Sequence, residues 1–115
     1  MIKLDKLISI PDGEAKGFDP LQQGRDSLFV VRQGSDFYPW ANACPHVGYE
    51  GAPMAWRKDA YLKVERTRII CSGHAAEFDV ESGVCLDGPC LGTVLQKADV
   101  RLAEDGCLYL FTNKD

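Results

Sequence analysis

The sequence predicts an all-β fold, a small antiparallel sandwich or barrel, and three observations lead to that prediction. Short runs rich in β-branched and aromatic residues recur along the 115 residues. Turn-forming residues, mainly glycine with aspartate or serine, separate these runs. No window combines a long helical period of apolar residues with helix-capping residues at its ends. Strands this short and evenly spaced favour antiparallel pairing.

In the first half of the chain, residues 27–32 (Ser-Leu-Phe-Val-Val-Arg) have the composition of a strand. Residues 33–36 (Gln-Gly-Ser-Asp) form the next predicted turn, and they lead into a second strand over residues 37–42. Trp40 falls within this second strand, where we expect it to belong to the core.

In the second half, residues 68–70 (Arg-Ile-Ile) predict a short strand that leads into Cys71. A turn over residues 81–83 separates two further short strands, at 78–80 and 84–85. Near the C-terminus, residues 99–102 alternate polar and apolar side chains, Asp-Gly follows at 105–106, and residues 108–111 are again apolar. This pattern is typical of a β-hairpin.

Length and charge limit the classes of function. A chain of 115 residues is long enough for one self-supporting core, so we assign residues 1–115 to a single domain. The net charge of −4 argues against binding nucleic acid or an anionic membrane surface. The sequence has no apolar run long enough to span a bilayer and no signal-peptide pattern at its start. We therefore expect a soluble, cytoplasmic protein that uses neither nucleic acid nor membrane.

Two short motifs each combine a cysteine with a histidine. Cys44-Pro-His46 and Cys71-Ser-Gly-His74 stand on either side of residues 47–70, and they contain both histidines of the chain. Two thiolates on one iron and two imidazoles on the other are the ligands of a Rieske-type [2Fe–2S] centre. We therefore predict that Cys44, His46, Cys71 and His74 bind one [2Fe–2S] cluster as its metal ligands, and that the chain has no catalytic residues.

Both motifs fall at predicted loops. Residues i and i+2 lie on the same side of an extended segment but on different faces of a helix. Two hairpin tips, each with one cysteine and one histidine, could therefore enclose the cluster from opposite sides. We expect the cluster-binding subdomain to span about residues 43–92.

The other three cysteines are Cys85, Cys90 and Cys107. An odd number of cysteines at irregular spacing does not resemble a disulfide framework. Unpaired cysteine is among the most buried residue types, so we expect these three to be small core side chains.

With these motifs the chain resembles the Rieske [2Fe–2S] ferredoxins. The family pattern Cys-Pro-His-x-Gly matches residues 44–48, and Cys-Pro-x-His-Gly-x-x-Phe matches residues 71–78 except at Ser72 and Ala75. A third stretch, Gly-x-Cys-x-x-Gly-Pro, matches residues 83–89. The resemblance covers about residues 28–111, most of the chain, and its specific motifs support the ligand assignment.

The resemblance also implies roles for residues near the ligands. Gly88-Pro89 corresponds to a loop that shields the cluster, and Phe78 to an aromatic side chain that packs beneath it. High-potential members place hydroxyl groups at the positions of Ala76 and Phe78. Hydrogen bonds to sulfur stabilise the reduced cluster, so we predict a potential at the low end of the Rieske range.

The function implied is that of a one-electron carrier between a reductase and an acceptor such as an oxygenase, rather than an enzyme. A complete oxygenase would need two further histidines for a mononuclear iron, and both histidines here are already assigned. Two alternatives remain open, namely a small electron-transfer subunit or redox sensor of a larger oxidoreductase complex and a structural zinc-binding domain. The gap of residues 47–70 is longer than in common Rieske ferredoxins, and within it Trp56 is a candidate docking residue.

Overall fold

The computed structural model describes residues 1–43, 61–62, 68–71, 76–88 and 91–111. Nine strands and one short 3₁₀ helix, η1 (Leu7–Ser9), occur in this part of the chain. The strands are β1 (Ile2–Lys6), β2 (Ala15–Phe18), β3 (Leu28–Gln33), β4 (Asp36–Ala41), β5 (Arg68–Cys71), β6 (Ala76–Asp79), β7 (Cys85–Asp87), β8 (Val100–Leu102) and β9 (Cys107–Leu110). No helix in these ranges is long and apolar enough to cross a membrane.

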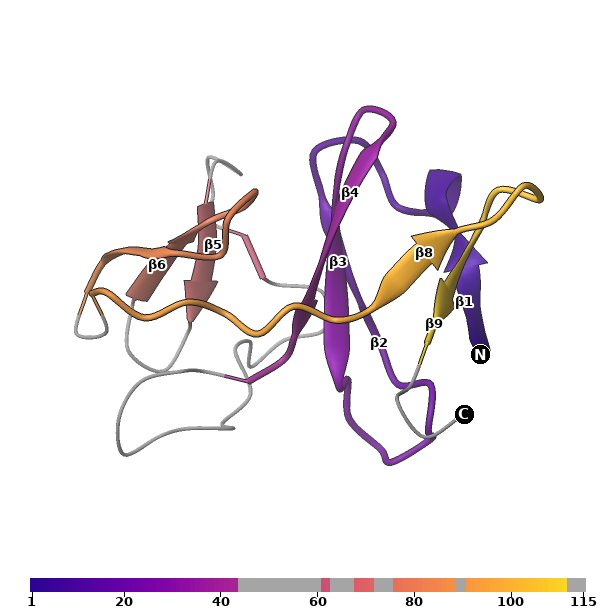
Figure 1. Ribbon diagram of the computed structural model, residues 1–115, viewed down its shortest axis with the longest axis horizontal. Helices are drawn as coiled ribbons and strands as arrows, with labels where there is room; N and C mark the ends of the chain where they lie inside the picture. The colour runs from indigo at the N-terminus through magenta and orange to yellow at the C-terminus, as the bar shows by residue number, and fades with distance from the viewer. Residues whose placement is uncertain (44–60, 63–67, 72–75, 89–90, 112–115) are drawn as a thin grey trace.

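The strands form three small antiparallel sheets. Their orders are β1-β9-β8, β2-β3-β4 and β5-β6-β7. Figure 1 shows the sheet β2-β3-β4 in the middle of the molecule, with β5 and β6 on one side and β1, β8 and β9 on the other. The predicted all-β antiparallel architecture is thus confirmed. The proposed subdomain at about 43–92 contains β5, β6 and β7, and its limits remain a prediction.

The central strand β3 is buried on both of its faces. Phe29 and Val31 point into one core and Leu28 and Val30 into another, and none of the four is more than 3% exposed. Side chains of a strand alternate between the two faces of its sheet. A strand covered on both faces therefore needs a continuous apolar run, and residues 28–31 supply it.

Two hydrophobic cores result. The first, called the cluster-side core, lies between the central sheet and β5-β6-β7 and comprises Ala15, Phe29, Val31, Trp40, Tyr61, Ile69, Cys71, Ala76, Phe78, Val80, Cys85 and Leu95. The second, called the distal core, lies between the central sheet and β1-β9-β8 and comprises Leu7, Ile10, Phe18, Leu28, Val30, Val100 and Leu108.

The segment that follows β7 ties the sheet β5-β6-β7 to the central sheet. The Cys85 amide donates to the Thr93 carbonyl over 2.9 Å, and the Leu95 amide donates to the Gly83 carbonyl over 2.8 Å. Farther along, the Ala41 amide at the end of β4 donates to the Gln96 carbonyl over 2.8 Å. This segment thus runs beside β7 and then beside β4.

The strands predicted over residues 27–32, 37–42, 68–70, 78–80, 84–85, 99–102 and 108–111 all correspond to observed strands, with ends displaced by at most two residues. Strands β1 and β2 and the helix η1 were not predicted. Residues 2–6 contain only two apolar side chains, and β2 has four residues, one of them Gly17. Both strands depend on partners distant in sequence, β9 and β3, which no local pattern reveals.

Candidate metal centre

Of the four predicted ligands, the structure describes Cys71, the last residue of β5. Its side chain is 1% exposed, and its partner across the β5–β6 ladder is Ala76. Residues 72–75 therefore connect two paired strands, so the sequence places His74 in a hairpin connection beginning directly after Cys71. Cys44, His46 and His74 lie outside the described residues. Within the described ranges, no three potential ligand side chains come together.

Cys71 is surrounded by apolar side chains. Ile69, Ala76 and Phe78, each 0% exposed, belong to the same core as Cys71. Phe78 lies opposite Cys85 in the β6–β7 pairing. A buried thiol in a dry setting, together with one more cysteine and two histidines in the sequence, suits a [2Fe–2S] cluster, since burial and solvent access are among the properties that tune such centres. Phe78 is a buried aromatic residue in the same core as Cys71, and its packing beneath the cluster stays a prediction.

Gly88, which follows β7, lies against the first residue of β6. Its φ is +102°, and a Cβ atom added to it would lie 2.8 Å from the Ala76 Cα atom. Only glycine combines this backbone conformation with such a close approach. The end of β7 is thereby held against the residue that follows the 72–75 connection. Pro89, the second residue of the expected shielding loop, lies outside the described residues.

Trp40 fixes the turn between β6 and β7. Its indole Nε1 donates to the Val80 carbonyl over 3.1 Å, and the side chain is 4% exposed. A Cβ atom on Gly83, whose φ is +74°, would lie 2.7 Å from ring carbons of Trp40. The ring therefore packs directly on the backbone of the turn. The predicted core position of Trp40 is confirmed, and the structure adds its hydrogen bond to Val80.

A second aromatic contact was not predicted. The rings of Tyr61 and Phe29 stack with centroids 4.2 Å apart, and the Tyr61 hydroxyl lies 3.3 Å from Asp26 Oδ2. A Cβ atom on Gly17 would lie within 3 Å of both Asp26 and Tyr61 side-chain oxygens. The glycine inside β2 was the available signal, since a glycine within a strand often marks a close approach.

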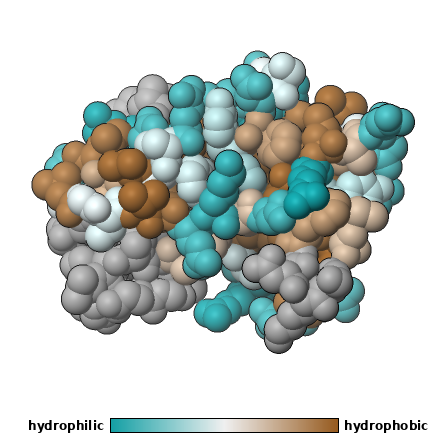
Figure 2. Space-filling view, viewed as in Figure 1, coloured by the Kyte–Doolittle hydropathy of each residue, from teal (hydrophilic) through white to brown (hydrophobic). Residues whose placement is uncertain are grey.

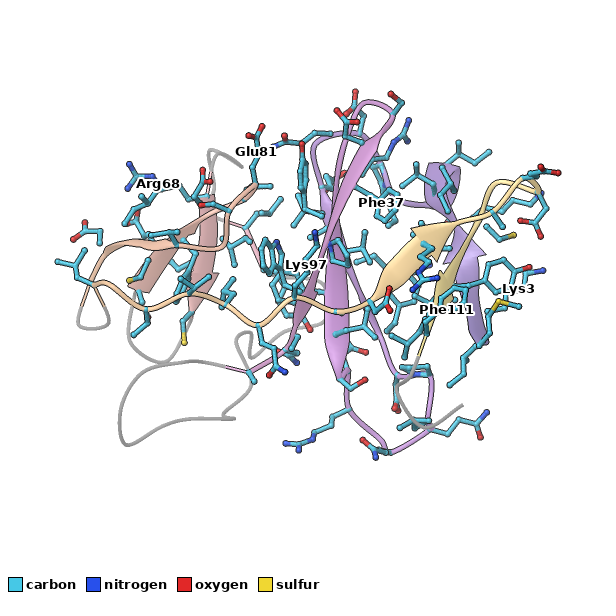
Figure 3. The ribbon with its side chains drawn as sticks, in the orientation of Figure 1. Lys3, Phe37, Arg68, Glu81, Lys97 and Phe111 are labelled. Atoms are coloured by element: carbon cyan, nitrogen blue, oxygen red, sulfur yellow. The ribbon has the colours of Figure 1, made fainter. Side chains whose placement is uncertain are left out.

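The acidic side chains of the β6–β7 hairpin differ in their surroundings. The Glu77 side chain is only 16% exposed and pairs with Arg68 over 3.0 Å. Asp79 accepts hydrogen bonds from the backbone and hydroxyl of Ser82, which close the turn. Figure 3 shows Arg68 and Glu81 at the end of the molecule that carries β5 and β6, with Lys3 and Phe111 at the other end.

Negative charge gathers where this hairpin meets β4. The pKa of Tyr38 is raised above 10.0, first by desolvation and then by the charges of Glu81, Asp36 and Asp79. Three carboxylates thus add to desolvation in raising this pKa.

Two of the three remaining cysteines are buried as expected. Cys85 in β7 is 3% exposed, and its thiol donates to the Asp87 carbonyl over 3.3 Å. Cys107 at the start of β9 is 2% exposed. Cys90 lies outside the described residues.

Comparison with known proteins identifies the family. Residues 3–102 match the sequence model of the Rieske [2Fe-2S] domain. The chain belongs to the Rieske [2Fe-2S] domain family. Members of this family carry one [2Fe-2S] cluster, in agreement with the cofactor predicted from the sequence. No curated protein matches the sequence significantly.

Solved structures share the fold of this Rieske domain. The ferredoxin of carbazole 1,9a-dioxygenase from Nocardioides aromaticivorans IC177 superposes with a TM-score of 0.67 at 24% identity, covering 95% of this chain and 94% of that one. The Sphingomonas yanoikuyae B1 ferredoxin gives a TM-score of 0.67 at 24% identity, covering 96% of both chains. A complex of reduced oxygenase and oxidized ferredoxin in carbazole 1,9a-dioxygenase gives 0.67 at 23% identity, covering 94% of this chain and 89% of that one.

Proposed function

We propose that this protein is a ferredoxin that carries single electrons from a reductase to an acceptor protein such as an oxygenase. The observation that carries the proposal is Cys71, a buried thiol at the end of β5, followed directly by the connection that contains His74 in the sequence. Membership of the Rieske family supports it, as does similarity of fold to proteins named as ferredoxins.

The proposed ligands are Cys44 and Cys71 on one iron and His46 and His74 on the other. When bound, the cluster would supply one-electron chemistry at a potential above that of all-cysteine ferredoxins, since neutral imidazoles replace two anionic thiolates. The chain's own contribution is to hold the ligands. Around Cys71 it does so with the β5–β6 ladder, the buried Phe78 ring and the Gly88–Ala76 contact.

An electron carrier needs no substrate pocket and no acid–base residue, which fits a chain whose two histidines are both assigned to iron. The acceptor is proposed to be an oxygenase component because one structural neighbour is a ferredoxin in complex with an oxygenase. The cytoplasmic location expected from the sequence stays a proposal.

Spectroscopy and potentiometry test the proposal together. The protein purified without oxygen should be red-brown, contain two irons and two sulfides per chain, and accept one electron from dithionite. Because Ala76 and Phe78 offer no hydroxyl to the cluster, the midpoint potential should fall below zero, in the lower part of the range of about −150 to +300 mV. A colourless protein with bound zinc would contradict the proposal.

If the chain is instead a subunit of a larger oxidoreductase complex, its behaviour during purification should differ. Expressed with its neighbouring genes, such a subunit would co-purify with a large partner at fixed stoichiometry. A diffusible ferredoxin would elute alone and exchange electrons with its partners only transiently.

A further inference from the structure

The outer surface beside β7 is apolar although most of its neighbours are polar. Along residues 83–87 burial alternates, with Gly83 and Cys85 buried and the side chains between and after them exposed. Val84 is 37% exposed, Leu86 43%, Leu91 65% and Val94 53%. Figure 2 shows hydrophobic residues gathered at the end of the molecule where β6 and the segment after it lie. We call these four residues the β7 apolar face.

Pairing brings three of the four side chains together. Val84 and Val94 face each other in an antiparallel bridge. Residues i and i+2 of a strand point to the same side, so Leu86 extends the surface formed by this pair. Leu91 lies in the connection between the two bridged residues, three residues before Val94. The inward neighbours Cys85 and Leu95 are both 3% exposed and belong to the cluster-side core.

One end of this face approaches the start of β6, the strand that follows the connection containing His74. Leu86 is two residues from Gly88, whose backbone lies against Ala76 at the start of β6. Ala76 in turn follows the connection that contains His74. A protein seated on the β7 apolar face would therefore lie beside Gly88 and the start of β6.

The strand β7 and its flanking segments carry only negative charge, although the partly exposed Arg68 pairs with Glu77 and the exposed Lys97 follows this part of the chain. Residues 76–96 contain the four carboxylates Glu77, Asp79, Glu81 and Asp87 and no lysine or arginine. Glu77 is paired with Arg68, whereas Glu81 and Asp87 are exposed. An apolar centre with an acidic rim is complementary to an apolar surface with a basic rim.

A second copy of this chain would not present the basic rim that complements the β7 apolar face. A twofold contact would bring the acidic rims of two β7 apolar faces together, and like charges oppose such a contact. Four side chains also fall far short of the roughly 800 Å² per partner that a stable interface buries. Both facts favour a different protein that binds transiently.

We propose that the β7 apolar face is the surface on which this ferredoxin docks a redox partner whose electron-exchange site has an apolar centre and a rim of lysine or arginine. The proposal rests on the proposed function. Val84, Leu86, Leu91 and Val94 supply the desolvated contact, and Glu81 and Asp87 orient the approaching partner.

Stopped-flow oxidation of the dithionite-reduced holoprotein tests this, with cytochrome c as a protein acceptor whose haem edge is surrounded by lysines. Ferricyanide serves as a small acceptor that needs no docking surface. Leu86→Ser should lower the second-order rate constant for electron transfer to cytochrome c about five-fold. The reason is that the apolar contact between the Leu86 side chain and the partner is lost. Its rate to ferricyanide, visible spectrum and midpoint potential should match the wild type.

Leu102→Ser is the matched control, since Leu102 is a leucine in a three-residue strand with 45% exposure, in the opposite sheet. It should leave both rates unchanged. Asp87→Asn should weaken the salt dependence of the cytochrome c rate, since one attractive charge is removed. If Leu86→Ser fails to assemble the cluster, Val94→Ser carries the same expectation.

Equal rates to cytochrome c for Leu86→Ser and wild type, or equal slowing by Leu102→Ser, would overturn the docking surface and leave the electron-carrier function intact. A wild-type protein that reduces neither acceptor would overturn the proposed function and the docking surface with it.

Discussion

The two cores on either face of β3 contain different kinds of side chain. The distal core contains only aliphatic residues and phenylalanine among its buried members. The cluster-side core also contains tryptophan, tyrosine and two cysteines, and hydrogen bonds connect several of them to backbone or carboxylate groups. Adjacent residues of β3 therefore pack into two cores of different chemical composition.

The hydrogen bonds of the cluster-side core give it a more defined geometry than the distal core has. Apolar contacts alone tolerate small displacements, because many arrangements of similar volume are nearly equal in energy. A hydrogen bond such as that from Trp40 to Val80 specifies a distance and an angle. The core beside the proposed ligands is thus fixed in geometry, whereas the distal core chiefly contributes stability.

The largest expected contrast is between two buried cysteines. Cys71→Ala should abolish the visible absorbance of the assembled cluster, because a proposed iron ligand is lost. Cys107→Ala, at the start of β9 in the distal sheet, should keep the full absorbance and lose only modest stability. Iron and sulfide analysis with visible circular dichroism measures both, and a Cys71→Ala protein with a normal spectrum would refute the ligand assignment.

Two hairpin glycines give the next contrast. Gly83 in the β6–β7 turn and Gly106 in the β8–β9 turn have φ values of +74° and +82°. Alanine at Gly106 meets no atom within 4 Å, so Gly106→Ala should cost about 1 kcal/mol from the backbone alone. Gly83→Ala would also collide with the Trp40 ring, adding roughly 1–3 kcal/mol. Urea unfolding followed by fluorescence compares them, and equal losses would show that the Trp40 contact is unimportant.

Two neighbouring valines of β3 test whether the two cores have different roles, with the distal core contributing stability and the cluster-side core fixing the geometry around the proposed ligands. Val30 faces the distal core and Val31 the cluster-side core, and both are at most 1% exposed. Each valine-to-alanine change should cost about 2 kcal/mol of unfolding free energy. Only Val31→Ala should also speed the loss of the cluster on incubation with a chelator. Identical rates of loss in the two variants would remove the proposed division between the cores.

The smallest effect is expected at an exposed carboxylate of the distal sheet. The Cys107 backbone amide, followed by the Tyr109 hydroxyl, lowers the pKa of Asp105 below 3.8. A lowered folded-state pKa gives stability that is present above the unfolded pKa and lost as pH falls through the folded value. Asp105→Asn should therefore flatten the loss of stability below about pH 4. Unfolding measured across this range checks it, and parallel curves would contradict the assignment.

Local patterns in the sequence determined the strands and turns of the hairpins. Asp-Gly at 105–106 specifies a reversal by itself. The alternation over residues 99–102 predicts that Val100 and Leu102 face inward, and this is correct for Val100 but not for Leu102, which is 45% exposed at the end of β8. The sequence also predicts the four ligands, because thiol and imidazole pairs are chemically distinctive, and the role of all four as ligands stays a prediction. Their convergence stays a prediction for Cys44, His46 and His74.

Only the tertiary structure decided how these hairpins assemble. The pairing of β1 with β9, the burial of β3 on both faces and the packing of Trp40 on Gly83 join residues far apart along the chain. Such contacts depend on shape and register across the whole molecule, whereas turn and ligand motifs depend on a few adjacent residues. For the same reason, the β7 apolar face could be recognised only from the structure, in which Val94 lies opposite Val84.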